Sequence, residues 1–269
     1  MQKKDRWLDS NLGMIILSTL FILGSFIVQI LIEALMKGIG IEDKYICDSV
    51  SRLLVVAGAI LIVVGIKWNI DLRLVGKGIK LGVLLGWPIY IAMGINIYDV
   101  CTMSHIDKIP SALGWISYIL YVFAIGAYEE VVLRGIVLNK MLEKWGRNKK
   151  GIVGAVLLSS LLFGLLHLVN LIGKPWLVVA TGTQVVYALF LGIFFSAIYL
   201  RTKNLWSVII LHMLLDLGGC LDELFITKVT AKTVPDISLG DSMSVLAEWL
   251  IFLVLGLWYL RKVKEKIKK

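Results

Sequence analysis

The sequence predicts an all-α membrane protein, a polytopic bundle of about eight transmembrane helices around a polar cavity inside the membrane. The chain has 269 residues, of which 58% are hydrophobic and 17% charged, and its mean hydropathy is +0.86. A soluble domain would carry about a quarter charged residues. Long apolar runs recur along the chain, and ionisable residues interrupt several of them. This composition excludes a soluble enzyme, a disordered chain and a disulfide scaffold.

The apolar runs are the predicted membrane spans. A helix of about 20 apolar residues crosses the hydrocarbon core. Backbone polar groups in lipid must be satisfied within the segment, so helices are expected and strands are not. We therefore expect one integral membrane domain over residues 1–269. The eight runs are residues 12–35, 53–66, 79–100, 111–142, 152–169, 178–200, 205–219 and 245–260, of which the second and seventh are short.

The basic residues predict the orientation. If the N-terminus is cytoplasmic, 21 of the 28 Lys and Arg residues fall on the cytoplasmic side. This bias predicts that both termini are cytoplasmic. The net charge of +9 is then a topology signal and an attraction to anionic lipid, which leaves no role for nucleic acid. The seven basic residues assigned to the outer side are Lys37, Lys44, Arg52, Lys108, Lys174, Lys228 and Lys232.

Three other features have simple interpretations. The first run follows a basic cluster, but it is too long for a signal peptide and lacks a cleavage site, so we expect a retained span. Residues 67–80 mix apolar and basic side chains; an amphipathic interfacial helix and a solvated loop are equally good interpretations. The odd count of cysteines, without metal-like spacing, favours three free thiols over a disulfide. These cysteines are Cys47, Cys101 and Cys220.

Ionisable residues inside a span are costly and are treated as functional candidates. The fourth run contains Glu129, Glu130 and Arg134. Glu130 and Arg134 are four residues apart and share a helix face, so they are expected to form an ion pair. Glu129 points about 100° away and is left as the free carboxylate, which suits a general base. The alternative is that all three residues solvate a helix end at the cytoplasmic interface.

Two further spans carry histidines. His167 lies late in the fifth run, and Phe163 precedes it by one helical turn. In the seventh run, His212 and Asp216 are four residues apart and therefore lie on one face. A buried histidine packed and hydrogen-bonded for stability is the alternative at each position. His105, in a predicted outer loop, is interpreted as a surface residue.

Together these residues predict one intramembrane site. A free glutamate, two histidines and an aspartate in three spans are each costly to bury, and convergence on one cavity explains them all. The sequence lacks H-E-x-x-H and G-x-S-x-G, two signatures of zinc and serine hydrolases. Water activated by Glu129 is therefore favoured over a serine or cysteine nucleophile.

These motifs resemble a known family. E-E-x-x-x-R at Glu129–Arg134, F-x-x-x-H at Phe163–His167 and H-x-x-x-D at His212–Asp216 occur in that order. Together they are similar to the CAAX-protease and bacteriocin-processing family of intramembrane glutamic-type endopeptidases, also called the Abi family. The resemblance covers residues 111–219, the family's core of four helices.

The resemblance implies roles for the motif residues. Glu129 and His167 would activate a water for attack on the scissile carbonyl, and His212 and Asp216 would stabilise the oxyanion. Glu130 and Arg134 would support them, and Phe163 would line the site. Where CAAX-processing members often carry Asn, this chain has Asp216, which can donate to an oxyanion only when protonated. A metal-free mechanism is preferred; a divalent metal such as zinc is the alternative, since all four catalytic candidates are competent ligands.

The implied partners are a lipid bilayer and a membrane-associated peptide or protein substrate. That substrate is a prenylated protein, a bacteriocin or pheromone leader, or another small membrane peptide, and the implied location is a bacterial plasma membrane. A non-proteolytic bacteriocin self-immunity or adaptor protein is the main alternative. A proton-coupled transporter is disfavoured because the two halves of the chain show no repeat.

Overall fold

The computed structural model describes residues 10–65, 78–104, 106–226 and 236–263, and the described part is helical without strands. Short irregular helices extend three of the main ones: η1 (Val131–Leu138) is π-helical, and η2 (His167–Val169) and η3 (Leu221–Leu224) are 3-10 turns. The α-helices are α1 (Asn11–Gly38), α2 (Lys44–Gly65), α3 (Ile79–Leu85), α4 (Trp87–Cys101), α5 (Ala112–Glu130), α6 (Asn139–Trp145), α7 (Lys149–Leu166), α8 (Asn170–Gly173), α9 (Val178–Thr202), α10 (Leu205–Gly219) and α12 (Leu239–Arg261).

These helices confirm the predicted membrane-protein fold class. Six described helical segments are long and apolar enough to cross a membrane, and a seventh forms if α3 and α4, bent by 57°, count as one span. The shorter apolar helix α10 accounts for the remaining predicted run. The bend falls at Gly86, with Pro88 in the first turn of α4. Proline is well tolerated there because the first N–H groups of a helix have no intrahelical partner.

The second span differs from the sequence-based prediction. We expected it to begin at residue 53, but α2 begins at Lys44. Its first turns contain Asp48 and Arg52, which form an ion pair within the helix. Opposite charges four residues apart neutralise each other, so hydropathy alone underestimates how far the helix extends. Arg52 therefore lies within the helix of a candidate span and not in a loop before it.

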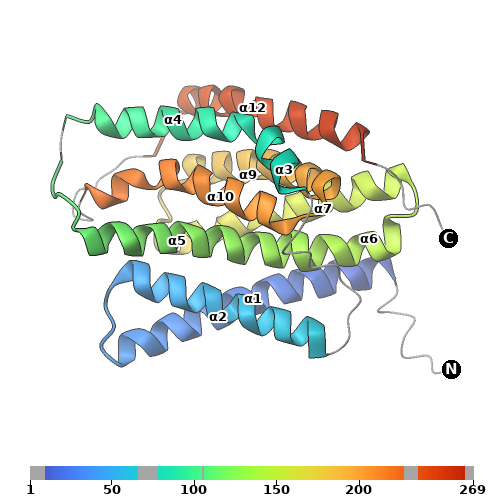
Figure 1. Ribbon diagram of the computed structural model, residues 1–269, viewed down its shortest axis with the longest axis horizontal. Helices are drawn as coiled ribbons and strands as arrows, with labels where there is room; N and C mark the ends of the chain where they lie inside the picture. The colour runs from blue at the N-terminus through green and yellow to red at the C-terminus, as the bar shows by residue number, and fades with distance from the viewer. Residues whose placement is uncertain (1–9, 66–77, 105, 227–235, 264–269) are drawn as a thin grey trace.

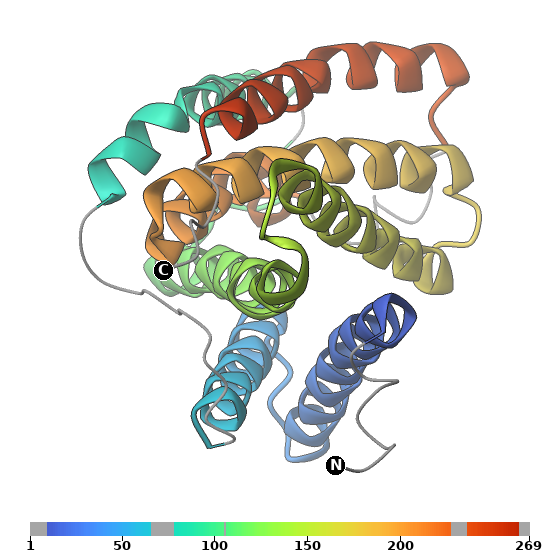
Figure 2. The ribbon, with the colours of Figure 1, turned by 90° about the vertical axis from the view of Figure 1, so that its right-hand side faces the viewer.

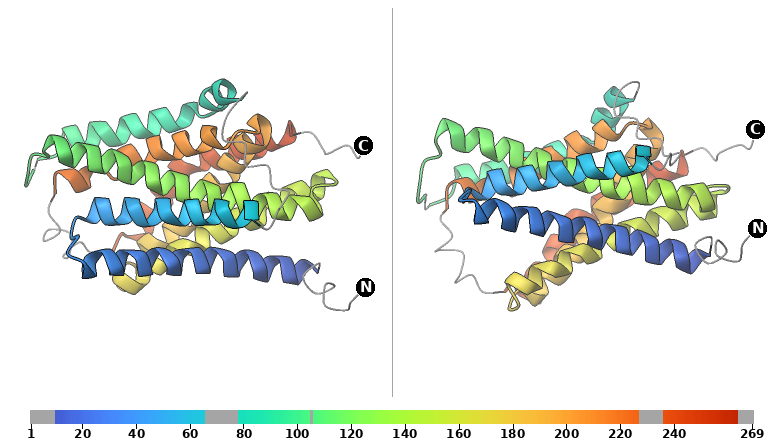
Figure 3. Two further views of the ribbon diagram at one scale, coloured as in Figure 1. Left: turned by 60° about the horizontal axis from the view of Figure 1, so that its bottom comes forward. Right: turned by 90° about the horizontal axis from the view of Figure 1, so that it is seen from below.

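The helices run lengthwise through an elongated bundle (Figure 1). Seen end-on, α1 and α2 lie on one side, α4 and α12 on the opposite side, and α5, α7, α9 and α10 between them (Figure 2). α9 packs against α7 and α12, and α5 packs against α2 and α10. The views from below show α1 and α2 lying side by side along the outside of the bundle (Figure 3). The inner helices can therefore hold polar groups away from lipid.

The start of α1 and the end of α12 lie at the same end of the bundle (Figure 1). The turn between α6 and α7 connects both: Trp145 Nε1 donates to Asn11 Oδ1 at 2.9 Å, and Lys149 Nζ donates to the Val263 carbonyl at 2.9 Å. A chain that crosses the membrane an even number of times would have these two ends on the same side. The face of the membrane at which this end lies stays a prediction.

The outer surfaces of α1 and α12 expose large aliphatic side chains, such as Leu35 and Val254, as lipid-facing helices do. The three cysteines are free, as predicted. His105 and nearly all of the 67–80 segment lie outside the described residues, so both interpretations stay predictions.

Candidate active site

A buried ion pair forms the centre of the site. Glu130 ends α5 and Arg134 lies one turn later in η1, with 0% and 2% of their side chains exposed. Arg134 Nη1 donates to Glu130 Oε1 at 2.8 Å, so the ion pair predicted from their spacing is present. The Arg134 guanidinium also lies 4.8 Å from the Phe163 ring centre and 5.6 Å from that of Phe195. Aromatic faces stabilise a cation in a site without water.

His212 connects this pair to a second helix. Its Nδ1 lies 2.8 Å from Glu130 Oε1, and because a carboxylate oxygen accepts, Nδ1 carries the proton. The ring stacks on Phe195 with centroids 5.3 Å apart. The helices α5 and α10 come close enough for this bond because position 126 is glycine. A Cβ on Gly126 would lie only 3.0 Å from the Ile209 carbonyl oxygen.

Side-chain hydrogen bonds stabilise the π-helical segment η1 that follows Glu130. In the π-helical segment η1 the usual backbone pairing is shifted, a feature that is common at functional sites. Asn139 Nδ2 donates to the carbonyl oxygens of Arg134 and Gly135, at 3.1 and 2.9 Å, and contacts Tyr199 Oη at 2.6 Å. These bonds satisfy carbonyls at the irregularity and hold the end of η1 against α9.

Glu129 directly precedes Glu130 on α5 and approaches the other nitrogen of the His212 ring. Its side chain is 20% exposed, and its Oε2 lies 3.6 Å from His212 Nε2, beyond direct hydrogen-bond distance. The prediction that Glu129 lacks the arginine partner of Glu130 agrees with this geometry. Glu129 instead lines a cavity of about 520 Å³.

His167 lines the same cavity. It starts the 3-10 turn η2 at the end of α7, where its Nδ1 lies 3.1 Å from the Phe163 carbonyl oxygen. A carbonyl can only accept, so Nδ1 donates, and in the neutral ring Nε2 is left as the basic nitrogen. Phe163 also lines the cavity and packs edge-on against His167, with centroids 5.2 Å apart.

The cavity lies between α1, α2, α5 and the end of α7. Most of its walls are aliphatic or aromatic, and polar side chains are few. A second cavity, of about 710 Å³, shares Phe26, Val169, Asn170 and Ile172 with it and continues toward the start of α9. The first cavity is lined by Thr19, Ile22, Leu23, Phe26, Arg52, Tyr128, Glu129, Leu162, Phe163, Leu165, Leu166, His167, Leu168, Val169, Asn170 and Ile172.

His212 and Asp216 are not among the residues that line this cavity. Asp216 Oδ2 lies 3.6 Å from His212 Nε2, as the shared helix face predicts, and it is buried without a hydrogen-bond partner. Tyr118 Oη donates to the Leu217 carbonyl oxygen at 2.8 Å and holds the end of α10 in place. His212 therefore joins Asp216 and Glu129 in one cluster, of which Glu129 is the member that lines the cavity.

His212 Nε2 faces two carboxylates. Since Nδ1 donates to Glu130, a neutral His212 would direct its Nε2 lone pair at Glu129 and Asp216. Lone pairs and negative charges that face one another repel, and a proton on Nε2 would turn this repulsion into attraction. Such a coupled cluster can take up and return a proton.

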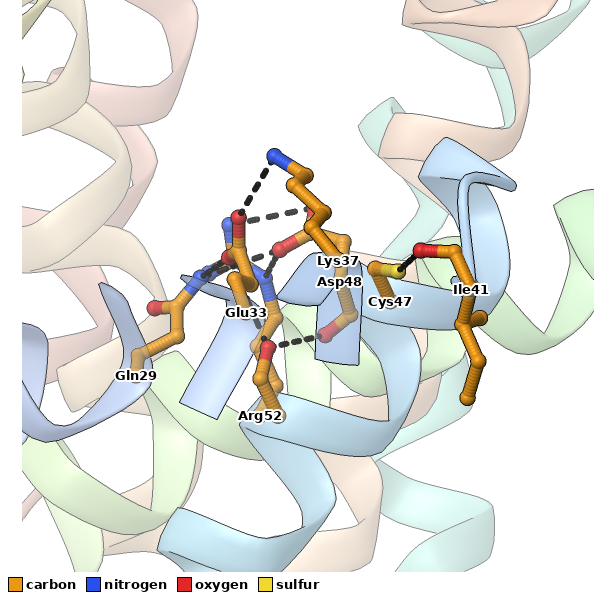
Figure 4. A network of polar contacts seen from close by, with 8 residues as sticks. Gln29, Glu33, Lys37, Ile41, Cys47, Asp48 and Arg52 are labelled. Atoms are coloured by element: carbon orange, nitrogen blue, oxygen red, sulfur yellow. Dashed lines mark hydrogen bonds and ion pairs between the residues drawn. The ribbon is translucent and has the colours of Figure 1, made fainter. Parts of the chain in front are cut away.

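A further part of the site comes from α1 and α2, and the sequence motifs did not predict it. Arg52 lines the cavity, and its Nε donates to Asp48 Oδ1 at 2.8 Å. Gln29 Nε2 donates to Asp48 Oδ1 and to Glu33 Oε1, both at 2.9 Å, so the network joins the two helices (Figure 4). The signal is present in the sequence as Asp48 and Arg52, four residues apart, but both precede the apolar run that is predicted to begin at residue 53.

The described part of the chain shows no cluster of three or more His, Cys, Asp or Glu side chains placed to hold a metal ion. Glu129, His212 and Asp216 are close to one another, and His167 lines the same cavity as Glu129.

The comparison with protein families agrees with this architecture. Residues 111–218 match the family described as type II CAAX prenyl endopeptidase Rce1-like. The matched segment contains α5, α7, α9 and nearly all of α10, and with them all three motifs. Over this segment the chain is similar to that family of endopeptidases, and its long apolar helices are those of a polytopic membrane protein. No curated protein and no solved structure matches the chain.

Proposed function

We propose that this protein is an intramembrane endopeptidase in which Glu129 and His167 activate a water molecule. The observation that carries the proposal is that both side chains line one mostly apolar cavity although they come from different helices. A carboxylate and a neutral imidazole nitrogen facing the same space are the groups that general-base catalysis needs. The matched family supplies the reaction class, cleavage of a peptide bond.

The proposed reaction is a direct attack by water. Glu129 accepts a proton as the water oxygen bonds to the scissile carbonyl carbon, and His167 Nε2 accepts a hydrogen bond from that water. The carbonyl π electrons move onto oxygen to form a tetrahedral oxyanion. When this intermediate collapses, the C–N bond breaks and Glu129 returns the proton to the leaving amine.

We assign His212 and Asp216 to the proton on Glu129 in addition to the oxyanion role that the resemblance implies. Neither lines the cavity, but His212 Nε2 is 3.6 Å from both carboxylates. Glu130 and Arg134 orient the His212 ring from behind. Removing a residue from this group would therefore change the pH dependence of the reaction as well as its rate.

The substrate we propose is a membrane-associated peptide segment. The walls of the cavity are apolar on α1 and α7, and the adjoining second cavity prolongs the space toward the start of α9. A CAAX-type C-terminal peptide and a bacteriocin or leader peptide both have this chemistry. The bacterial plasma membrane and cytoplasmic termini belong to the same proposal.

The test is cleavage by purified protein in nanodiscs. A quenched peptide library containing prenylated and leader-type sequences is offered to the wild type, to Glu129→Gln and to Glu143→Gln, with and without chelator. Glu143 pairs with Lys140 and is 34% exposed, so its variant controls for loss of a carboxylate. We expect Glu129→Gln to lower kcat/KM by about 100- to 10,000-fold and Glu143→Gln to match the wild type.

Equal cleavage by Glu129→Gln and wild type would contradict the mechanism. No cleavage by folded wild type, together with equal toxin protection by wild type and Glu129→Gln, would favour the non-proteolytic immunity or adaptor function. Activity lost only in chelator would replace the metal-free mechanism with a metal-dependent one.

A further inference from the structure

The proposed reaction forms an oxyanion next to Glu129 and His167. An oxyanion needs a hydrogen-bond donor that already points at the reacting atoms. The resemblance assigns this role to His212 and Asp216, which are not among the residues that line the described cavity. The question is therefore which donor faces the same space as Glu129 and His167.

Arg52 meets this requirement. It is the one cationic side chain among the residues that line the described cavity, and 15% of its side chain is exposed there. Its charge and that of Glu129 attract each other. No hydrogen bond from Nη1 occurs in the described structure, whereas Nε and Nη2 both donate to Asp48, at 2.8 and 3.4 Å.

The surroundings hold Arg52 in place. Asp48 binds one edge of the guanidinium and is itself held by Gln29 from α1. The Tyr128 ring lies 5.4 Å from the guanidinium carbon, and its Oη hydrogen-bonds with Ser25 Oγ at 2.9 Å. Tyr128 directly precedes Glu129, so one short segment of α5 positions both the proposed base and the arginine. A donor fixed before the reaction stabilises developing charge without reorganisation.

We propose that Arg52 is a further catalytic residue that donates a hydrogen bond to the oxyanion of the tetrahedral intermediate. This inference rests on the proposed function. It extends the site beyond the family-matched residues 111–218 to α2, which lies outside them. As the water attacks, the negative charge that forms on the carbonyl oxygen is opposite in sign to the guanidinium, and no proton needs to leave Arg52.

The test compares Arg52→Gln and Arg52→Lys with wild type on a cleaved peptide, offered with a free C-terminal carboxylate and as its amide. We expect Arg52→Gln to lower kcat by about 100-fold or more, with KM nearly unchanged, because the lost interaction exists mainly in the transition state. Arg52→Lys keeps the charge but not the planar fork, so it should recover part of the rate. The loss should be equal for both forms of the peptide.

Binding provides a second readout that does not depend on turnover. A phosphinic pseudopeptide of the cleaved sequence mimics the tetrahedral oxyanion. Arg52→Gln should lose affinity for it by about the same factor as kcat, while affinity for the uncleaved peptide, measured in the Glu129→Gln background, stays unchanged. Melting curves of each variant show whether it is folded.

Three results would overturn the inference. A loss confined to the free-carboxylate peptide would make Arg52 a carboxylate-binding residue. Unchanged kcat in folded Arg52→Gln would make the Asp48–Arg52 pair purely structural. If neither Arg52 variant folds, Gln29→Leu is measured instead, because it removes the donor to Asp48. An unchanged kcat and an unchanged affinity for the pseudopeptide in Gln29→Leu would also contradict the inference. In each case the wild type still cleaves, whereas failure of the proposed function would appear as wild type without cleavage.

Discussion

Arg134 and Arg52 occupy the same local motif in two regions of the molecule. Each follows an acidic residue by four positions on a helix, pairs with it at 2.8 Å and lies against an aromatic ring. Yet the Arg134 side chain is 2% exposed and sealed between α5, α7 and α9, whereas Arg52 lines the cavity. The motif determines the pair, and the surrounding helices determine whether its charge can reach a substrate.

The largest expected effect comes from breaking the sealed pair. Arg134→Met leaves the Glu130 carboxylate buried and without its partner, and we expect it to lower the free energy of unfolding by about 3–5 kcal/mol. Arg52→Met should cost less because Asp48 is 12% exposed and retains Gln29 as a donor. Denaturation in detergent, followed by circular dichroism, measures both. Equal costs for the two variants would contradict the comparison.

A double variant makes the same comparison sharper. In Glu130→Gln with Arg134→Met the buried charges are removed together, so we expect part of the stability lost in Arg134→Met to return. Activity should not return with it, since His212 Nδ1 loses its carboxylate acceptor. The free energy of unfolding and kcat are measured on the same preparation. A double variant less stable than Arg134→Met would indicate that the ion pair itself is not what stabilises this region.

The smallest effect is expected at Gln29. Its side chain is buried and donates to Glu33 and Asp48, so Gln29→Leu removes two bonds to carboxylates that are partly exposed. We expect a loss of about 1 kcal/mol in stability and a decrease in kcat smaller than that of Arg52→Gln. Lys37→Met is the matched control, because Lys37 is 58% exposed and lies 4.0 Å from Glu33. A change in kcat for Lys37→Met would show that the network is not specific to Arg52.

Prediction succeeded where neighbours in sequence are neighbours in space. The Glu130–Arg134 pair and the shared face of His212 and Asp216 follow from the pitch of the helix and are present. It failed at the start of α2 because a window of hydropathy counts Asp48 and Arg52 as two separate charges. The roles of His212 and Asp216 at the reacting carbonyl stay predictions.

The sequence by itself determined the class of protein, the helical structure of its apolar runs and the residues whose burial is costly. These properties depend on composition and on contacts within one helix. Only the tertiary structure decided that Glu129 from α5 and His167 from the end of α7 face one cavity, and that Arg52 from α2 joins them. These contacts between helices depend on how closely the helices can approach. Small residues such as Gly126 permit a close approach at particular crossings. Spacing along one chain carries no such information.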